Sequence, residues 1–282
     1  MRISVIAAIY KDIEALKIII EALKNQTYAN FELIVAEDNN DPAIADYLST
    51  VNDIDILHTS QKDVGIQKAR SQNNAIIKST GDYLIFIDGD CIPYPNFVSS
   101  HAALAEDGSV LSGRRVNLGP RISQNIRSGL LNTSSLAKYY LLYIPWLWFD
   151  GTTHIGQGLP LSINGWIYKN IFANRKKSNT NILGCNFSCF KKDILNIDGF
   201  DESYGETALP DDTDIQWRFQ ASGLKLKSCK MIANVFHLHH PARQNQLTDG
   251  ERHMKKMLIK KSIGDYVATT GISSHKENKN HL

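Results

Sequence analysis

Three short apolar runs, separated by helical patterns, most constrain the fold of this chain. The runs lie at Ile3–Ile9, residues 31–36 and residues 83–87, and each is as continuously apolar as a strand buried on both faces. Between the runs we predict helices at 13–23, 42–50 and 64–79 and a weak strand at 54–58. This β-α-β-α rhythm predicts an α/β fold, with a mostly parallel twisted sheet that is flanked by helices.

The pattern changes after residue 114. Residues 115–182 are rich in aromatic residues, glycine and proline, and they follow no assignable periodicity. Order returns in the predicted elements that follow: a strand at 184–190, a helix at 211–222 closed by Gly223, strand material at 225–236 and a basic amphipathic helix at 248–261. The last dozen residues are polar, and we expect them to be disordered.

Composition narrows the class of protein. The chain of 282 residues has a net charge of +2, from 31 basic and 29 acidic residues, which argues against a nucleic-acid partner. Its four cysteines form no CxxC pair, which favours a reducing cytosol and a cytoplasmic protein. The N-terminus does not resemble a signal peptide, and no run of about 18 apolar residues predicts a spanning helix. Residues 139–149 come nearest, but Pro145 interrupts them, and we interpret them as buried or membrane-surface material.

Paired acids follow one of the predicted strands. Asp88-Gly89-Asp90 comes directly after the run at 83–87, and ligands of open parallel sheets bind at the carboxyl ends of the strands. Glycine permits a sharp turn there, so both carboxylates can face one Mg²⁺ or Mn²⁺ ion that bridges to a diphosphate. The other interpretation is an ordinary Asp-Gly turn with solvated acids. The apolar run at residues 31–36 likewise ends in acidic residues, Glu37 and Asp38.

Two clusters in the C-terminal half add candidate chemistry. Asp211-Asp212-Thr213-Asp214 places three acids together, and one of them can act as a general base. A helix cap is the other interpretation, because Thr213 and Gln216 match a capping box. Between residues 237 and 240, three histidines follow a predicted strand and can ligate the same metal. A polar loop or an all-histidine zinc site are the alternatives there.

A glycine-led segment offers a third group of polar residues. Gly65 precedes a predicted helix that carries Lys68, Arg70 and Asn73, and such side chains can meet a phosphate or a sugar. An ordinary amphipathic helix explains the same pattern.

Taken together, these motifs resemble the inverting family-2 glycosyltransferases of the Rossmann-like GT-A fold. The resemblance covers residues 3–114 and, as a galactosyltransferase-type segment found in bacterial polysaccharide and chondroitin-synthase-like enzymes, residues 184–241. It implies a single domain with a C-terminal acceptor-side subregion. We expect a nucleotide-sugar-binding half at 1–114, a variable acceptor-side insertion at 115–183, a catalytic-base and metal-histidine segment at 184–247, and a basic helix with a flexible tail at 248–282.

The resemblance also implies a role for individual residues. Those on the donor side are Ala8, Tyr10, Asp38, Arg70, Asp88, Gly89 and Asp90. Asp90 and His237, with His240 in reserve, would hold Mn²⁺ or Mg²⁺, and Asp212 would be the general base. Two departures matter: Glu37-Asp38-Asn39-Asn40 replaces the family's Asp-Asp-Gly-Ser, and Asp211-Asp212 replaces its Glu-Asp pair. The second departure leaves open which of the two acids acts.

The resemblance therefore implies an enzyme that moves a hexosyl or N-acetylhexosaminyl group with inversion. The donor would be a nucleotide-sugar, with UDP expected, and the acceptor a glycan or a lipid-linked saccharide of surface polysaccharide biosynthesis. The basic helix at 248–261 and the aromatic run at 139–149 suggest peripheral contact with the inner face of a membrane, although a helix packed on the core explains the former equally well. The alternative functions are a sugar nucleotidyltransferase and a non-catalytic nucleotide-sugar-binding subunit.

Overall fold

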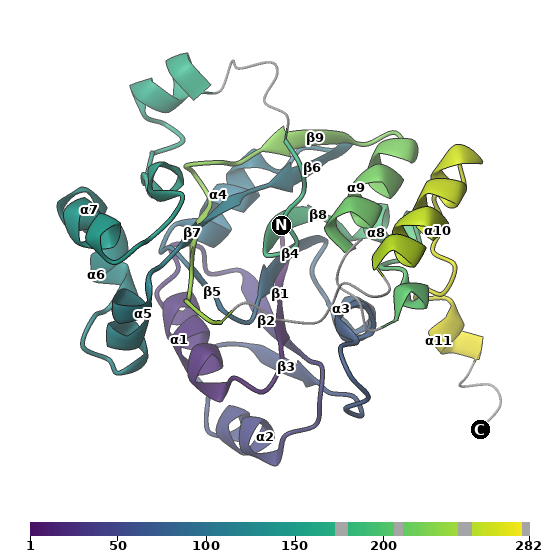
Figure 1. Ribbon diagram of the computed structural model, residues 1–282, viewed down its shortest axis with the longest axis horizontal. Helices are drawn as coiled ribbons and strands as arrows, with labels where there is room; N and C mark the ends of the chain where they lie inside the picture. Colours follow the sequence, from purple (N-terminus) through teal and green to yellow (C-terminus); the bar gives the residue numbers. More distant parts are fainter. Residues whose placement is uncertain (173–179, 206–210, 242–249, 278–282) are drawn as a thin grey trace.

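The computed structural model describes residues 1–172, 180–205, 211–241 and 250–277, without the side chains of residues 172, 211, 276 and 277. Within these residues a twisted seven-stranded sheet forms the centre of the molecule (Figure 1). Its spatial order is β3 (Ile56–Thr59), β2 (Phe31–Glu37), β1 (Ile3–Ile9), β4 (Tyr83–Asp88), β8 (Asn186–Phe190), β6 (Ser109–Ser112) and β9 (Lys225–Ser228).

The sheet is mostly parallel, as predicted. β1, β2, β3 and β4 run in the same direction, whereas β8 is antiparallel to both of its neighbours, β4 and β6. In the observed register Ala8 lies opposite Ala36 on one side and Asp88 on the other. The carboxyl ends of these three strands therefore meet at one edge, which is where the acidic motifs were expected to lie.

A smaller sheet carries the histidines to that edge. Within the described residues it has three strands, in the order β5 (Cys91–Pro93), β10 (Asn234–His237) and β7 (Arg114–Asn117). His237 is paired with Cys91, the residue after Asp90. The strand material predicted at 225–236 is thus two strands in different sheets, β9 and β10. The chain turns between them at Met231, which has a φ of 65°.

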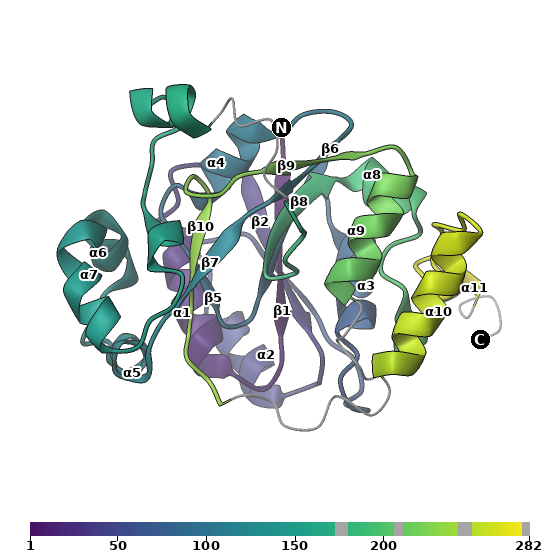
Figure 2. The same cartoon turned by 45° about the horizontal axis from the view of Figure 1, so that its top comes forward.

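Helices cover both faces of the large sheet (Figures 1 and 2). The helices of the described residues are α1 (Ile13–Lys24), α2 (Pro42–Ser49), α3 (Lys68–Lys78), α4 (Phe97–Leu104), α5 (Pro120–Arg127), α6 (Thr133–Lys138), α7 (Tyr140–Phe149), α8 (Lys191–Asn196), α9 (Asp211–Ala221), α10 (Gly250–Ser262) and α11 (Ser274–Glu277), with the short turns η1 (Ile155–Gly158), η2 (Tyr168–Phe172) and η3 (Glu202–Tyr204).

Alternating side chains of the strands divide the core into two parts. Val5 and Ile85 pack in the part that contains α1 and α4, whereas Ile6 and Phe86 pack in the part that contains α3, α8 and α9. Because side chains of a strand point to opposite faces in turn, a strand covered on both sides must be apolar at every position. This requirement explains the continuous apolar runs in the sequence.

Several predicted boundaries differ from the structure. The helix predicted from residue 64 begins only at Lys68, because Gly65 has a φ of 87° and the Gln67 N–H is bonded to the Asp38 carboxylate at 2.7 Å. The predicted capping box is wrong. Thr213 lies inside α9, and the Gln216 side chain accepts a hydrogen bond from the Ile182 N–H.

The C-terminal region also corrects the prediction. The basic helix predicted at 248–261 is observed as Gly250–Ser262, with residues 248 and 249 outside the described part of the chain. Ser274–Glu277 forms α11 within the dozen residues that were expected to be disordered, and residues 278–282 lie outside the described residues. The buried Met257 packs α10 against Tyr204 and Trp217, so the core-packing interpretation of this helix holds.

Most of residues 115–172 could not be assigned from sequence; after β7 ends at Asn117, α5, α6 and α7 form a helical lobe beside α1. α6 and α7 pack against each other, and Figures 1 and 2 show them at the edge of the molecule farthest from α10. Most of α7 is exposed, with Tyr140 and Leu147 as its buried residues, so the interpretation of this run as core material is wrong for most of its length. Among the described residues, no helix is long and apolar enough to cross a membrane.

Candidate active site

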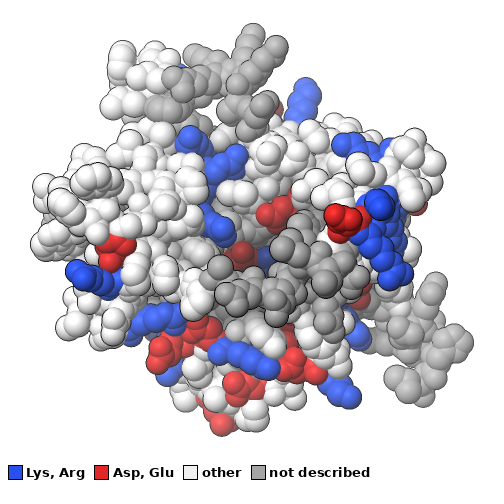
Figure 3. All heavy atoms as spheres, in the orientation of Figure 1, with Lys and Arg blue, Asp and Glu red and all other residues white. Residues whose placement is uncertain are grey.

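A cleft of about 660 Å³ lies at the carboxyl ends of β1, β2 and β4. Figure 3 shows acidic and basic side chains gathered around a hollow in the middle of this face. The cleft is lined by nine of the predicted site residues: Ala8, Tyr10, Asp38, Asp88, Gly89, Asp90, Asp212, His237 and His240. Arg70 is exposed on α3 and does not line the cleft, and the side chain of Asp211 lies outside the described atoms.

The two acids of Asp88-Gly89-Asp90 have different partners. Asp88 accepts a hydrogen bond from Lys68 Nζ at 2.5 Å. The backbone turns at Gly89 and Asp90, as expected, although Gly89 does not adopt a positive φ. A Cβ at this position would lie 2.7 Å from the carbonyl oxygen of Ala8. Glycine is needed here because the backbone of β1 passes too close for any side chain.

Asp90 forms a compact cluster with two histidines. Asp90 Oδ2 lies 3.3 Å from Nε2 of His237 and 3.3 Å from Nε2 of His240. Burial raises the pKa of Asp90, but the hydrogen bonds from both imidazoles outweigh burial, so the pKa lies well below its usual range. The backbone fixes this arrangement, because the Leu238 N–H donates to the Asp90 carbonyl oxygen at 2.9 Å.

The cluster fits a divalent transition metal. One possible ligand atom from each of Asp90, His237 and His240 lies within 4.8 Å of the other two. One carboxylate and two imidazoles suit Mn²⁺ better than Mg²⁺, which prefers oxygen ligands throughout. The third histidine, His239, takes a different direction, and its backbone N–H donates to Ser123 Oγ at 2.8 Å. The donor set therefore selects two of the three histidines.

Asp212 lines the cleft, unlike Asp214, the other acid of its cluster whose side chain the structure describes. Its Oδ1 accepts a hydrogen bond from the Gly184 N–H at 2.8 Å. Burial raises the pKa of Asp212, while the charge of Lys68 and the bond from Gly184 act in the opposite direction. A carboxylate with a raised pKa, held rigidly at the start of a helix beside a cleft, has the properties of a general base.

The side chain of Asp214, only two residues away, is buried in the protein core. It accepts hydrogen bonds from the Tyr204 hydroxyl at 2.8 Å and from Trp217 Nε1 at 3.0 Å. It also pairs with Arg218, which is fully buried and donates to the carbonyl oxygens of Ile197 and Gly199. Asp214 thus stabilises the packing of α9 and has no direct access to the cleft.

Asp38 lies at the far end of the cleft, beyond β2. Its carboxylate accepts hydrogen bonds from Gln61 Nε2 at 2.6 Å and from the Gln67 N–H at 2.7 Å. Burial raises the pKa of Asp38 above its ordinary value. Tyr10 is 37% exposed, and the ammonium of Lys11 lies 4.8 Å from the centre of its ring. An aromatic ring and an acid at this end form a surface of the kind that can bind a base and a ribose.

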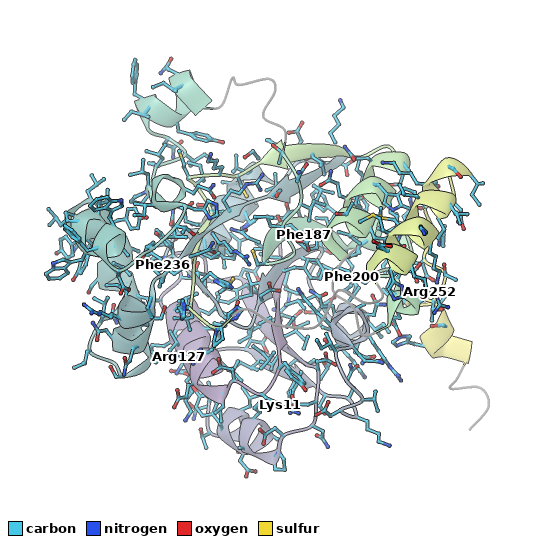
Figure 4. All side chains as sticks on the ribbon, viewed as in Figure 1. Lys11, Arg127, Phe187, Phe200, Phe236 and Arg252 are labelled. Carbon is cyan, nitrogen blue, oxygen red and sulfur yellow. The ribbon has the colours of Figure 1, made fainter. Side chains whose placement is uncertain are left out.

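Two arginines of the cleft, Arg115 and Arg127, were not predicted from the sequence. Arg115 follows the first residue of β7, and Arg127 makes a two-pronged ion pair with Asp12 at 2.9 and 2.7 Å (Figure 4). Both come from the region that the sequence left unassigned, and no local motif marks them. Asn73, a candidate ligand contact, instead bonds the backbone of Phe200 and the Glu202 side chain.

Comparison with known sequences assigns this chain to a family. The profile of glycosyl transferase family 2 matches residues 4–161. The chain belongs to that family. A second profile, described as the N-terminal domain of galactosyltransferase, matches residues 170–241 and so includes Asp212, His237 and His240.

Two relatives named as glycosyltransferase and synthase match part of the chain. An uncharacterized glycosyltransferase of Rickettsia bellii is 29% identical over 49% of this chain, and the hyaluronan synthase of Pasteurella multocida is 29% identical over 40%. The chain spans about a fifth and about an eighth of those two proteins, respectively.

Two similar structures bear on the fold. S. aureus TarS in complex with UDP has a TM-score of 0.59 and 13% identity, covering 97% of this chain and 68% of that one. The Pyrobaculum calidifontis mannosyltransferase PcManGT, in complex with GDP-Man and Mn²⁺, has a TM-score of 0.54 and 14% identity, covering 94% and 62%. These likenesses confirm the predicted GT-A fold.

Proposed function

We propose that this chain transfers a hexosyl or N-acetylhexosaminyl group from a nucleotide-sugar to a saccharide hydroxyl, with inversion at the anomeric carbon. The observation that carries the proposal is the meeting of two clusters in one cleft: Asp90 with His237 and His240, and Asp212 at the start of α9. A nucleotidyltransferase or a non-catalytic subunit has no need of a rigid, cleft-facing base.

The donor we propose is a UDP-sugar. Asp38 and Tyr10 would receive the base and ribose, while Ala8, Asp88 and Gly89 line the floor toward the diphosphate. TarS has been solved with UDP and with UDP-GlcNAc, which supports a uridine nucleotide. Lys68 and Arg115 are the cationic side chains that would lie near the diphosphate. Lys68 and Arg70 were both candidates from the sequence, and of the two only Lys68 lines the cleft.

The reaction we propose is a single in-line displacement. Asp212 accepts the proton of an acceptor hydroxyl, whose oxygen bonds to the anomeric carbon as the bond from that carbon to the diphosphate oxygen breaks. The electron pair of the broken bond leaves with the nucleoside diphosphate, and the configuration inverts. Mn²⁺ held by Asp90, His237 and His240 would offset the charge that grows on the departing diphosphate. Asp211 remains the second candidate base.

We place the acceptor in surface polysaccharide biosynthesis, on the cytoplasmic side of the membrane, as a glycan or a lipid-linked saccharide. Residues 1–114 would bind the donor, residues 115–183 the acceptor, and residues 184–247 supply the base and the metal-binding histidines, followed by the α10 region at 248–282. The names of the relatives, which include a hyaluronan synthase, support a polysaccharide product.

A donor screen tests the proposal. The purified chain is mixed with UDP- and GDP-sugars and a panel of saccharide acceptors, and the released nucleotide is measured with Mn²⁺, with Mg²⁺ and with EDTA. We expect release that depends on an acceptor and on Mn²⁺, with product of inverted configuration by NMR. UDP binding without turnover on any acceptor would favour the non-catalytic subunit, whereas diphosphate release from a nucleoside triphosphate and a sugar phosphate would favour the nucleotidyltransferase.

A further inference from the structure

The most apolar surface among the described residues lies on α7. Leu141, Leu142, Trp146, Trp148 and Phe149 are 64–80% exposed, and the loop between α5 and α6 adds Leu130 at 81%. Apart from tyrosine hydroxyls and indole N–H groups, the side chains of α7 carry no polar atom. Contiguous apolar surface of this kind on a water-exposed helix marks a contact site. We call the exposed face of α7 the apolar face.

A second apolar element lies on the same side of the molecule. η2 and the residues before it expose Trp166, Ile167 and Ile171, at 71%, 48% and 40%. Figures 1 and 2 both show η2 on the side of the molecule where α7 lies, and α10 on the opposite side. In Figure 3 the lobe at the position of α7 is almost entirely free of charged side chains.

Exposed cationic side chains occur in the same region of the chain as the apolar face. Residues 115–172 contain five lysines and arginines, of which Arg115 and Arg127 line the cleft, and a single acid, Asp150, although the whole chain is nearly balanced. Lys138 and Lys169 are exposed beside α7 and within η2, and Arg121 is exposed on α5. The Asp150 carboxylate accepts hydrogen bonds from the backbone N–H groups of Arg121 and Ile122 in the first turn of α5. The surface is therefore apolar with a cationic margin.

We propose that α7 and η2 dock onto an anionic lipid bilayer. Exposed tryptophan, leucine and phenylalanine with lysine at the margin match the interfacial region of a membrane, where apolar side chains enter the acyl boundary and cations meet headgroup phosphates. α7 has ten residues, a length of about 15 Å, which allows it to lie in the interface but not to cross the apolar core.

Two other occupants fit this surface less well. A two-fold contact with a second copy through α7 would add the positive charge of Lys138 from both copies to one interface, and α7 offers no acid to balance it. A glycan would need amide or carboxylate groups beside the rings, and α7 offers none. Charge and composition therefore favour a lipid surface.

The helical lobe that carries α7 borders the cleft through α5. α5 leads from the cleft into the helical lobe, since Arg127 lines the cleft and Ser123 accepts the His239 N–H at 2.8 Å. The segment that carries the metal-binding histidines is thus bonded directly to the lobe that carries α7. If the proposed glycosyl transfer holds, the acceptor class that this placement favours is a saccharide carried on a membrane lipid.

The tryptophans make the proposal directly testable. Trp146, Trp148 and Trp166 are exposed here, while the fourth tryptophan of the chain, Trp217, is 4% exposed in the core. With vesicles that contain phosphatidylglycerol we expect a blue shift of the emission, quenching by brominated acyl chains and co-sedimentation. Pure phosphatidylcholine vesicles should bind far less, and salt should weaken the binding.

A pair of double variants locates the contact. Leu142→Glu with Trp148→Glu should lower the vesicle partition coefficient by about tenfold or more, because both side chains lose their burial in lipid. The matched control is Leu258→Glu with Ile259→Glu on α10, which exposes similar side chains at 52% and 64% and should bind as the wild type does. Circular dichroism and the emission of Trp217 report that both variants are folded.

Several results would overturn the proposal. They are a wild type that does not bind phosphatidylglycerol vesicles, an α7 variant that binds normally, and an α10 variant that alone loses binding. A concentration-dependent dimer without vesicle binding would assign the face to a second copy, and an emission change with soluble oligosaccharide alone would assign it to a glycan. The binding assay contains no donor, so it is independent of the proposed reaction.

Discussion

Replacing Asp212 by asparagine should separate chemistry from binding. The amide oxygen of the introduced side chain can still accept the Gly184 N–H, so the loop at 184 keeps its anchor. The amide cannot accept a proton as the carboxylate does, and removal of a general base lowers turnover by about 10²- to 10⁴-fold. That loss corresponds to about 3–5 kcal/mol of transition-state stabilisation. UDP affinity should stay unchanged, because Asp90 and its histidines are not altered.

The same variant has a defined effect on stability. Burial raises the pKa of Asp212 in the folded state above its unfolded value. The carboxyl group therefore contributes stability below the unfolded pKa, and this contribution is lost as pH rises through the raised folded pKa. At neutral pH the ionised group is a cost that asparagine removes. Urea unfolding at pH 7 should show a free energy of unfolding equal to or above that of the wild type.

Two assays on one sample test whether Asp212 is the general base. Turnover is followed by nucleotide release with a productive donor and acceptor, and UDP affinity is measured by calorimetry in Mn²⁺. The wild type should lose activity as pH falls through a pKa above the ordinary aspartate value, because the base must be ionised. Asp46→Asn, at an exposed acid on α2, is the matched control. An Asp212→Asn variant within threefold of wild-type turnover would refute its role and direct attention to Asp211.

Three further variants test the surrounding structure. Asp90→Ala should abolish the Mn²⁺-dependent part of UDP binding, so calorimetry that shows wild-type UDP affinity for the variant in Mn²⁺ would remove Asp90 from the metal site. Asp214→Ala should lower the free energy of unfolding by about 3–5 kcal/mol in urea titration, because it leaves the buried Arg218 charge unpaired; a loss below about 1 kcal/mol would contradict the buried pair. Gly184→Ala places a Cβ 2.3 Å from Asp212 Oδ1 and should reduce turnover while UDP binding is kept, and unchanged kinetics would show that the carboxylate position is not critical.

The sequence does not show which acid of the cluster at 211–214 is the base. Asp211, Asp212 and Asp214 are chemically identical side chains close together in the chain, so the sequence gives no reason to prefer one of them. The structure separates two of them, because positions two residues apart on a helix differ by about 200° in direction, which places Asp214 toward Arg218 in the core and Asp212 toward the cleft. The direction in which a helix faces depends on what packs against it, and that information is held by distant residues.

Much of the fold followed from local pattern. Buried strands at β1, β2 and β4 and the helices between them were predictable, since a strand covered on both faces must be apolar throughout and an amphipathic helix must show its period. The reversed direction of β8 and the separation of β9 from β10 were not predictable, because pairing partners are set by contacts between remote segments. The helix α7 within residues 115–172 was not predicted for another reason. It is apolar around its whole circumference, so its sequence shows no helical period.

Asp88-Gly89-Asp90 and the later histidines were recognisable as candidate ligands from the sequence by itself, because strand-end carboxylates and clustered imidazoles are the groups that bind metals. Tertiary structure decided that His237 and His240 meet Asp90 while His239 does not. It also decided that Arg115 and Arg127 reach the same cleft. Sequence determines which side chains a site can use. The pairing of β5, β7 and β10 determines which of them converge, because only the folded register brings residues more than a hundred positions apart within reach of one ion.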